Sequence, residues 1–354
     1  MKKFENLIWK LFGLITIIGI TSLFFSCTGP EGPSGKDGAT GTEVCKTCHN
    51  ESTVMYAKMI QWENSVHATG VDFERNDSTC APCHTSEGFR ETIVTGKENC
   101  AAKIKNPSGQ NCRTCHFVHA NFDSTDFRLT WPNTTVLRLS GQTTLDIGKG
   151  NLCARCHQAR AVNPLPVPAG DSLSITSNRW GPHHGPMANI LNGMGGYVFP
   201  GKVYENSPHA QMVSNGCVSC HMADAFGAQA GGHTMKMTYD YHGNETDNLA
   251  GCINTGCHPA AKSFDIDNVQ TDVEVMLVNL RNNLAGRGWL DTASSGGLYH
   301  LDILKASSSK PLRVSSDQAG AILNYLLVAS DRSMGVHNAK YIKGLLQNSI
   351  EALQ

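Results

Sequence analysis

The sequence predicts a mainly α-helical fold with much irregular structure, in which a long cysteine-rich part precedes a helical C-terminal cap. Most of the 14 cysteines occur in short pairs between residues 45 and 257. The segments between these pairs are rich in Gly, Pro and Asn and have little sustained hydrophobic periodicity. After about residue 262, apolar residues recur at helical spacing.

A secretory leader is predicted over residues 1–26. Lys2 and Lys3 precede an apolar block of about fifteen residues. This is shorter than the roughly twenty residues that a permanent spanning helix needs. The small residue Ser26 followed by Cys27 resembles a bacterial lipobox. We therefore expect Cys27 to be the lipidated first residue of a mature protein held at a membrane surface. An ordinary signal peptide with a nearby cysteine is the alternative.

A tether is predicted over residues 27–42, where glycine recurs at every third position from Gly29 to Gly41. The period resembles the collagen repeat, but the triplets are too few for a stable triple helix. We expect a solvated linker. The predicted organisation is therefore a leader over 1–26, a lipidated tether over 27–42, a cysteine-rich part over 43–262 and a helical cap over 263–354 that packs on it.

The charge balance excludes a nucleic-acid partner. Loss of the leader removes three lysines and one glutamate from totals of 29 basic and 30 acidic residues, which leaves a net charge of about minus three. Charged residues make up 17% of the chain, whereas about a quarter is usual. Another source of polar surface is therefore expected.

Twelve cysteines form six pairs, each followed directly by histidine. They are Cys45 and Cys48 with His49, Cys80 and Cys83 with His84, Cys112 and Cys115 with His116, Cys153 and Cys156 with His157, Cys217 and Cys220 with His221, and Cys252 and Cys257 with His258. The spacing C-x-x-C-H is the attachment signature of c-type haem. The thiols bond the porphyrin vinyl groups, and the adjacent imidazole binds iron. Zinc sites and redox dithiols do not require a histidine after every pair. The chain is expected to carry six covalent haems, with Cys27 and Cys100 left over.

The sixth pair is wider than the others, because four residues separate Cys252 from Cys257. Gly256 can adopt positive φ, so the two additional residues can bulge out of the turn. We interpret this stretch as a sixth haem site. The alternative is a disulfide between the two cysteines, with His258 incidental.

Nine further histidines are available for the sixth coordination position of each iron. His67 and His209 occupy the same place in a repeated motif, Glu-Asn-Ser-x-His-Ala, and both are expected to be distal ligands. The serine also suits a helix N-cap, which is the structural alternative. His119 follows His116 by three residues, a spacing that would put both rings on one face of a helical turn.

Other candidates come from short glycine-rich motifs. His233 follows two glycines that would let the backbone approach a flat ring. Of the adjacent His183 and His184, we expect one to be a ligand, and the sequence leaves open which. His337 is the choice for the last site. His242 and His300 are predicted to lie at the surface or contact propionates, and the methionines are predicted to pack around porphyrin.

The predicted cap contains three amphipathic helices. Their apolar residues recur from Val269 to Leu284, with Gly286 as a stop, then from Ala319 to Leu326, and from Ile342 to Ile350. If His337 binds iron, the cap also belongs to the redox site.

The chain resembles bacterial multihaem cytochromes c, in the style of the superfamily of cytochrome c nitrite reductase, hydroxylamine oxidoreductase and octahaem tetrathionate reductase. Besides the cysteine motifs, the resemblance rests on the segments that carry His183, His209, His233 and His337. It implies that these flanking histidines are distal ligands. Two departures disfavour an enzyme: no cysteine pair ends in lysine, and no candidate for a cross-linked tyrosine is seen.

The expected function is electron transfer along mostly bis-histidine haems between the cell envelope and an acceptor. The protein is expected to be exported and lipid-anchored to the outer membrane, facing the periplasm or the cell surface. Its partners would be redox proteins or a terminal acceptor. A reductase of a small nitrogen or sulfur oxyanion, with one open haem site, is one alternative. The other is a subunit of a polymeric extracellular cytochrome filament.

Overall fold

The computed structural model describes residues 53–70, 74–139, 143–254, 256–292 and 302–354. The predicted leader, Cys27, the tether, the first cysteine motif with His49, and His300 lie outside these residues. Contacts group Glu51–Gln354 into one compact unit. Within the described ranges, no helix combines the length and apolar character needed to cross a membrane.

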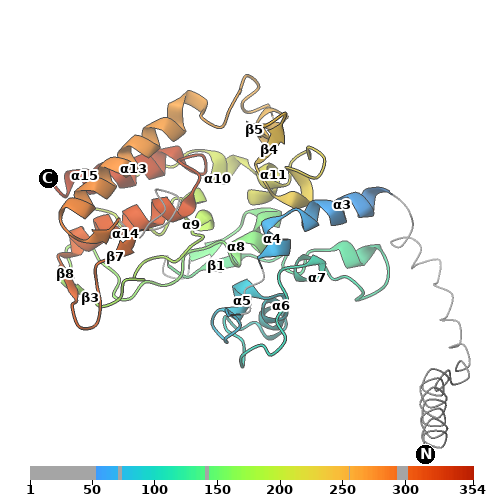
Figure 1. Cartoon of the computed structure of the whole chain (residues 1–354), viewed down its shortest axis with the longest axis horizontal. Helices are drawn as coiled ribbons and strands as arrows, with labels where there is room; N and C mark the ends of the chain where they lie inside the picture. Colours follow the sequence, from blue (N-terminus) through green and yellow to red (C-terminus); the bar gives the residue numbers. More distant parts are fainter. Residues whose placement is uncertain (1–52, 71–73, 140–142, 255, 293–301) are drawn as a thin grey trace, which may run out of the picture. The chain divides into compact units, whose positions relative to one another are not determined.

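The cysteine-rich part is built from short helices joined by turns, as predicted (Figure 1). These elements are α3 (Thr53–Glu63), α4 (Val66–Thr69), α5 (Ala81–His84), α6 (Ser86–Thr95), α7 (Cys112–Cys115), η1 (Ser124–Phe127), η2 (Gly148–Gly150), α8 (Asn151–Ala154), α9 (Met187–Leu191), α10 (His209–Met212), α11 (Cys217–His221), η3 (Gly232–Thr234) and α12 (Ala250–Ile253). Side chains often cap them: the Thr85 hydroxyl accepts a hydrogen bond from the Gly88 N–H at 2.9 Å at the start of α6.

Eight short strands form antiparallel pairs in the described chain. They are β1 (Thr135–Leu137) with β2 (Thr143–Leu145), β3 (Leu173–Ile175) with β8 (Leu312–Val314), β4 (Thr238–Tyr241) with β5 (Asn244–Asp247), and β6 (Leu290–Asp291) with β7 (Ile303–Leu304). The β3–β8 pair, in which Leu173 faces Val314, joins the cysteine-rich part to the C-terminal part.

The three predicted C-terminal helices are confirmed as α13 (Val269–Gly286), α14 (Ser316–Asp331) and α15 (Ala339–Glu351), and the turn η4 (Ile266–Asn268) precedes them. They pack against one another (Figure 1). A capping box starts α14: the Ser315 hydroxyl accepts from the Gln318 N–H at 3.2 Å, and the Gln318 side chain accepts from the Ser315 N–H at 3.0 Å.

Conventional hydrophobic packing is concentrated around these three helices. Leu280, Leu327 and Leu346 are fully buried there with many other apolar side chains, including residues from the segment before α9 and the segment after it. A second cluster in the cysteine-rich part is much smaller and contains five buried apolar residues. The two parts are therefore stabilised in different ways.

Candidate functional site

The cysteine motifs form closed turns that bring the histidine next to the first cysteine. A hydrogen bond from the histidine N–H to the carbonyl of the first cysteine closes three of them. The distances are 3.1 Å from His84 to Cys80, 2.8 Å from His116 to Cys112, and 2.9 Å from His157 to Cys153. Each turn therefore presents two thiols and one imidazole together.

The widened motif closes in the same way. The His258 N–H donates to the Cys252 carbonyl at 3.1 Å, although two more residues lie between them. Gly256 has φ of 76°, which is the positive φ predicted for the bulge. The insertion therefore leaves the relation between the first cysteine and the histidine intact.

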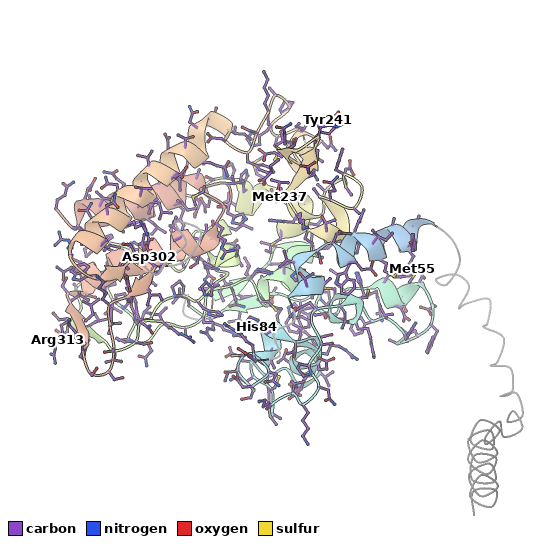
Figure 2. The ribbon with its side chains drawn as sticks, viewed as in Figure 1. Met55, His84, Met237, Tyr241, Asp302 and Arg313 are labelled. Atoms are coloured by element: carbon purple, nitrogen blue, oxygen red, sulfur yellow. The ribbon has the colours of Figure 1, made fainter. Side chains whose placement is uncertain are left out.

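The rings of five motif histidines each face a second histidine that the sequence analysis identified as a distal candidate. The ring centres are 6.0 Å apart for His67 and His157, 6.4 Å for His84 and His183, 6.3 Å for His116 and His233, 6.2 Å for His209 and His258, and 6.3 Å for His221 and His337. These contacts join segments that are far apart in the sequence. Figure 2 shows His84 at α5.

The separation of these rings fits a metal ion held between two imidazoles. A metal–nitrogen bond of about 2.0 Å plus about 1.2 Å from nitrogen to ring centre, counted on both sides, gives roughly 6.4 Å. In the described ranges no cluster of three or more His, Cys, Asp or Glu side chains is arranged to hold a metal ion. The arrangement of paired rings beside paired thiols fits a haem iron with two axial imidazoles.

Hydrogen bonds fix the orientation of several of these rings. His116 Nδ1 lies 2.7 Å from the Phe127 carbonyl, and His209 Nδ1 lies 2.9 Å from the Val336 carbonyl. His221 Nδ1 lies 3.1 Å from the Met235 carbonyl, which follows η3. A carbonyl only accepts, so each Nδ1 carries the proton. The Nε2 lone pair is then available for a metal.

His337 has a different partner. Its Nδ1 lies 2.7 Å from Oδ1 of Asp331, whose side chain is fully buried at the end of α14. Burial alone would lower the pKa of His337, but the charge of Asp331 and the hydrogen bond to it outweigh burial and raise this pKa. This histidine is therefore held by a carboxylate and not by a neutral carbonyl.

Burial keeps other imidazoles neutral. It lowers the pKa of His157 to about 4, with the charge of His67 adding to the effect. Burial also lowers the pKa of His183 to about 3, and the nearby Arg160 guanidinium contributes. A neutral imidazole has the free lone pair that a metal ligand requires.

Neighbouring cysteine motifs contact each other in the interior. The Cys156 thiol lies 3.8 Å from the Pro82 carbonyl in the motif of residues 80–84, and Cys217 packs against the apolar cluster that contains Ala154. The motif of residues 153–157 therefore lies next to the motifs of residues 80–84 and 217–221.

Two predictions about the distal histidines need correction or refinement. The helical turn expected to carry both His116 and His119 is wrong, because α7 ends at Cys115 and His119 has φ of 63°. The ring of His119 stacks on Phe122 at 5.4 Å. The sequence left open which of His183 and His184 would be a ligand. The ring of His183 faces that of the motif histidine His84, whereas the ring of His184 lies 5.2 Å from that of His183.

The serines of the repeated motif have different roles. Ser65 caps α4, where its hydroxyl accepts from the Ala68 N–H at 3.3 Å. The Ser207 hydroxyl instead accepts from the Lys340 N–H of α15 at 3.1 Å. In this copy of the motif, Ser65 caps the helix while the ring of His67 faces that of His157. A helix cap and a ligand role for His67 therefore do not exclude each other.

The glycines before His233 serve backbone packing. A Cβ on Gly232 would lie 2.5 Å from the Gln61 side-chain oxygen, and that same oxygen accepts from the His233 N–H at 3.1 Å. His242 lies in the β4–β5 turn, where its ring contacts Tyr241 at 4.4 Å. Figure 2 shows Tyr241 at this hairpin.

Two residues of the site escaped the sequence analysis. Asp331 gave no signal, because it lies six positions before His337 without a recognisable motif. Met235 was expected only to pack around porphyrin, yet its sulfur lies 3.1 Å from His67 Nδ1 and its carbonyl accepts the hydrogen bond of His221. Met235 thus contacts rings of two different pairs.

Comparison with known proteins identifies the fold. No protein-family model and no curated protein matches the chain. A solved structure that matches is the crystal structure of the outer cell wall cytochrome OcwA, with a TM-score of 0.50 and 23% sequence identity over 84% of this chain and 50% of that chain. The chain spans about half the length of that cytochrome. The chain therefore has a fold similar to that of part of this cytochrome.

Proposed function

We propose that the chain is a membrane-tethered multihaem c-type cytochrome that carries electrons between the cell envelope and an acceptor. The observation that carries this proposal is the set of five histidine pairs at 6.0 to 6.4 Å, each of which includes the histidine of a cysteine motif. Bound haem would supply a one-electron iron couple at each pair.

The chain would hold six haems through the thiols of its motifs and two imidazoles each. The cysteines are Cys45, Cys48, Cys80, Cys83, Cys112, Cys115, Cys153, Cys156, Cys217, Cys220, Cys252 and Cys257. Five of the axial pairs are those described above. For His49 we propose His119, the histidine of the predicted ligand set that is left after His183 is chosen over His184.

The contacts between motifs support a chain of closely spaced haems. The motif of residues 153–157 contacts Pro82 of the motif of residues 80–84 and lies next to Cys217. Helix α11, which carries Cys217 and Cys220, packs against α12, which carries Cys252. We propose that the haem of residues 153–157 is central, and that the haem of residues 217–221 connects it to the haem of residues 252–258.

Two imidazoles on each iron would leave no coordination position for a substrate, which favours a carrier over a reductase. Buried, neutral rings held by backbone hydrogen bonds would also keep the ligand geometry fixed when an electron arrives. The relation to the nitrite reductase and hydroxylamine oxidoreductase superfamily stays a prediction.

Export and lipid anchoring are part of the proposal. The likeness to an outer cell wall cytochrome supports a position outside the cytoplasm. The Cys27→Ala variant should pass from membranes to the soluble fraction with an unchanged number of haems, because the lipid would be attached before the first motif. Unaltered membrane association of the variant would contradict anchoring through Cys27.

The intact mass of the purified protein tests the proposed function. We expect a mass with six haems, one of them on Cys252 and Cys257. A mass with five haems and a disulfide between these cysteines would overturn the sixth site. A mass without haem would overturn the function.

A further inference from the structure

We propose that Asp331 is a positioning residue that lowers the reduction potential of the haem held by His221 and His337. This inference rests on the proposed function and goes beyond it, because it assigns a distinct redox property to one site. It begins with the contact between Asp331 Oδ1 and His337 Nδ1 at 2.7 Å.

The position of Asp331 makes its carboxylate an effective partner. Its side chain is fully buried, so solvent does not screen its charge as it would at the surface. The Ser333 hydroxyl donates to Oδ2 of the same carboxylate and accepts from the His337 N–H at 3.2 Å. Both carboxylate oxygens therefore accept hydrogen bonds, and these bonds hold the two ends of the segment from Asp331 to His337 together.

The backbone of this segment is also specialised. Arg332, Met334 and Gly335 all have positive φ, which is uncommon for residues other than glycine. This conformation turns the chain sharply after α14, so that His337 returns to its own helix end and faces His221 at 6.3 Å. The carboxylate and the ring are thus held together by the fold and not by flexible side chains.

The electronic consequence follows from the nature of the partner. A carboxylate that accepts the Nδ1 proton makes the imidazole a stronger electron donor than a neutral carbonyl does. A stronger donor and a nearby negative charge both stabilise ferric over ferrous iron. His116, His209 and His221 have backbone carbonyls at the corresponding nitrogen.

The Asp331→Asn variant tests this in the full-length holoprotein by redox titration with haem-resolved EPR. Asparagine keeps an oxygen that can accept the His337 hydrogen bond but removes the charge. We expect the reduction equilibrium constant of one haem to rise about tenfold, which is about 59 mV upward for a one-electron couple, with all haems still low-spin. The other five potentials should stay nearly unchanged.

Asp302→Asn is the matched control, because Asp302 is another fully buried carboxylate of the cap, paired with Arg281 at 2.7 Å. Figure 2 shows it among the C-terminal helices. The control should lower stability without shifting one haem potential selectively. If both variants leave all six potentials unchanged, or shift them alike, the proposal is overturned.

A second variant keeps the proposal testable if Asp331→Asn does not fold. Ser333→Ala removes the hydrogen bond to Oδ2 and leaves more negative charge facing His337, so the potential of the same haem should fall. A rise or no change would contradict the proposal. Haem number by intact mass separates the two failures: correct haem content with unshifted potentials refutes only this inference, whereas absent haem refutes the proposed function.

Discussion

The cysteine-rich part and the C-terminal cap contain different kinds of interior. The cap buries a large set of aliphatic side chains between α13, α14 and α15, as soluble helical proteins do. In the cysteine-rich part, the segment of residues 139–199 adds apolar side chains such as Ile190 and Tyr197 to that core, whereas the rest buries a small apolar cluster and brings together histidine rings from distant segments. We therefore expect side-chain packing to stabilise the cap, and a bound cofactor to stabilise the turns that carry the histidine pairs.

Polar contacts connect the two interiors. The Asn338 side-chain oxygen accepts from the Ser207 N–H at 2.8 Å, and its amide donates to the Ile190 carbonyl at 3.1 Å. Asn338 follows His337 directly. The cap therefore provides one ring of a histidine pair and also hydrogen-bonds to the segment that carries His209. The cap therefore does more than cover the site.

The largest expected effect comes from preventing haem attachment. In full-length protein made without haem, hydrogen exchange should show protected amides in α13, α14 and α15 and rapid exchange over residues 80–137 and 209–258, which lie outside the core of the cap. In the holoprotein both regions should be protected. Equal protection of residues 80–137 and 209–258 with and without haem would remove the basis of the comparison.

Replacement of a distal histidine should change one haem and leave the rest. In His67→Ala or His209→Ala, we expect one low-spin haem to become high-spin and its potential to rise, because an electron-donating imidazole is lost. EPR and redox titration report both changes. His242→Ala is the control, since that ring contacts Tyr241 and should leave every spin state as it was. Variants at His67 and His209 that stay fully low-spin would refute the ligand assignment.

A cavity in the cap should affect stability without affecting the haems. Leu327 is fully buried, so Leu327→Ala should cost about 2 to 5 kcal/mol of unfolding free energy. The exposed Val275 of α13 provides the control, and Val275→Ala should change stability by about 0.5 kcal/mol or less. Denaturant unfolding measures both. A change of haem spin state in Leu327→Ala under native conditions would mean that the two interiors are not separable.

The smallest effect separates capping from ligation in the repeated motif. Ser65→Ala removes the N-cap of α4 and should cost about 1 kcal/mol of stability. Because His67 remains, the EPR spectrum should not change. If Ser65→Ala itself produces a high-spin haem, the cap is needed to hold His67 in place.

The sequence allowed the cap to be predicted well, because the spacing of Val273, Leu277, Leu280 and Leu284 is a local property of one helix. The motif histidines were equally visible, since each follows its cysteines directly. The partner of each ring could not be predicted, because His67 and His157, for example, meet only through the path of the chain between them. The His119 prediction failed for a related reason: a local helical spacing was assumed where the turn ends at Cys115.

The central claim is that every haem has two histidine ligands, and EPR of the ferric protein as isolated tests it most directly. Five ring pairs at 6.0 to 6.4 Å, with His49 and His119 proposed as the sixth, predict low-spin signals that account for all six haems. These signals should not respond to nitrite or hydroxylamine. A high-spin haem that shifts when either compound is added would contradict the electron carrier and favour a reductase.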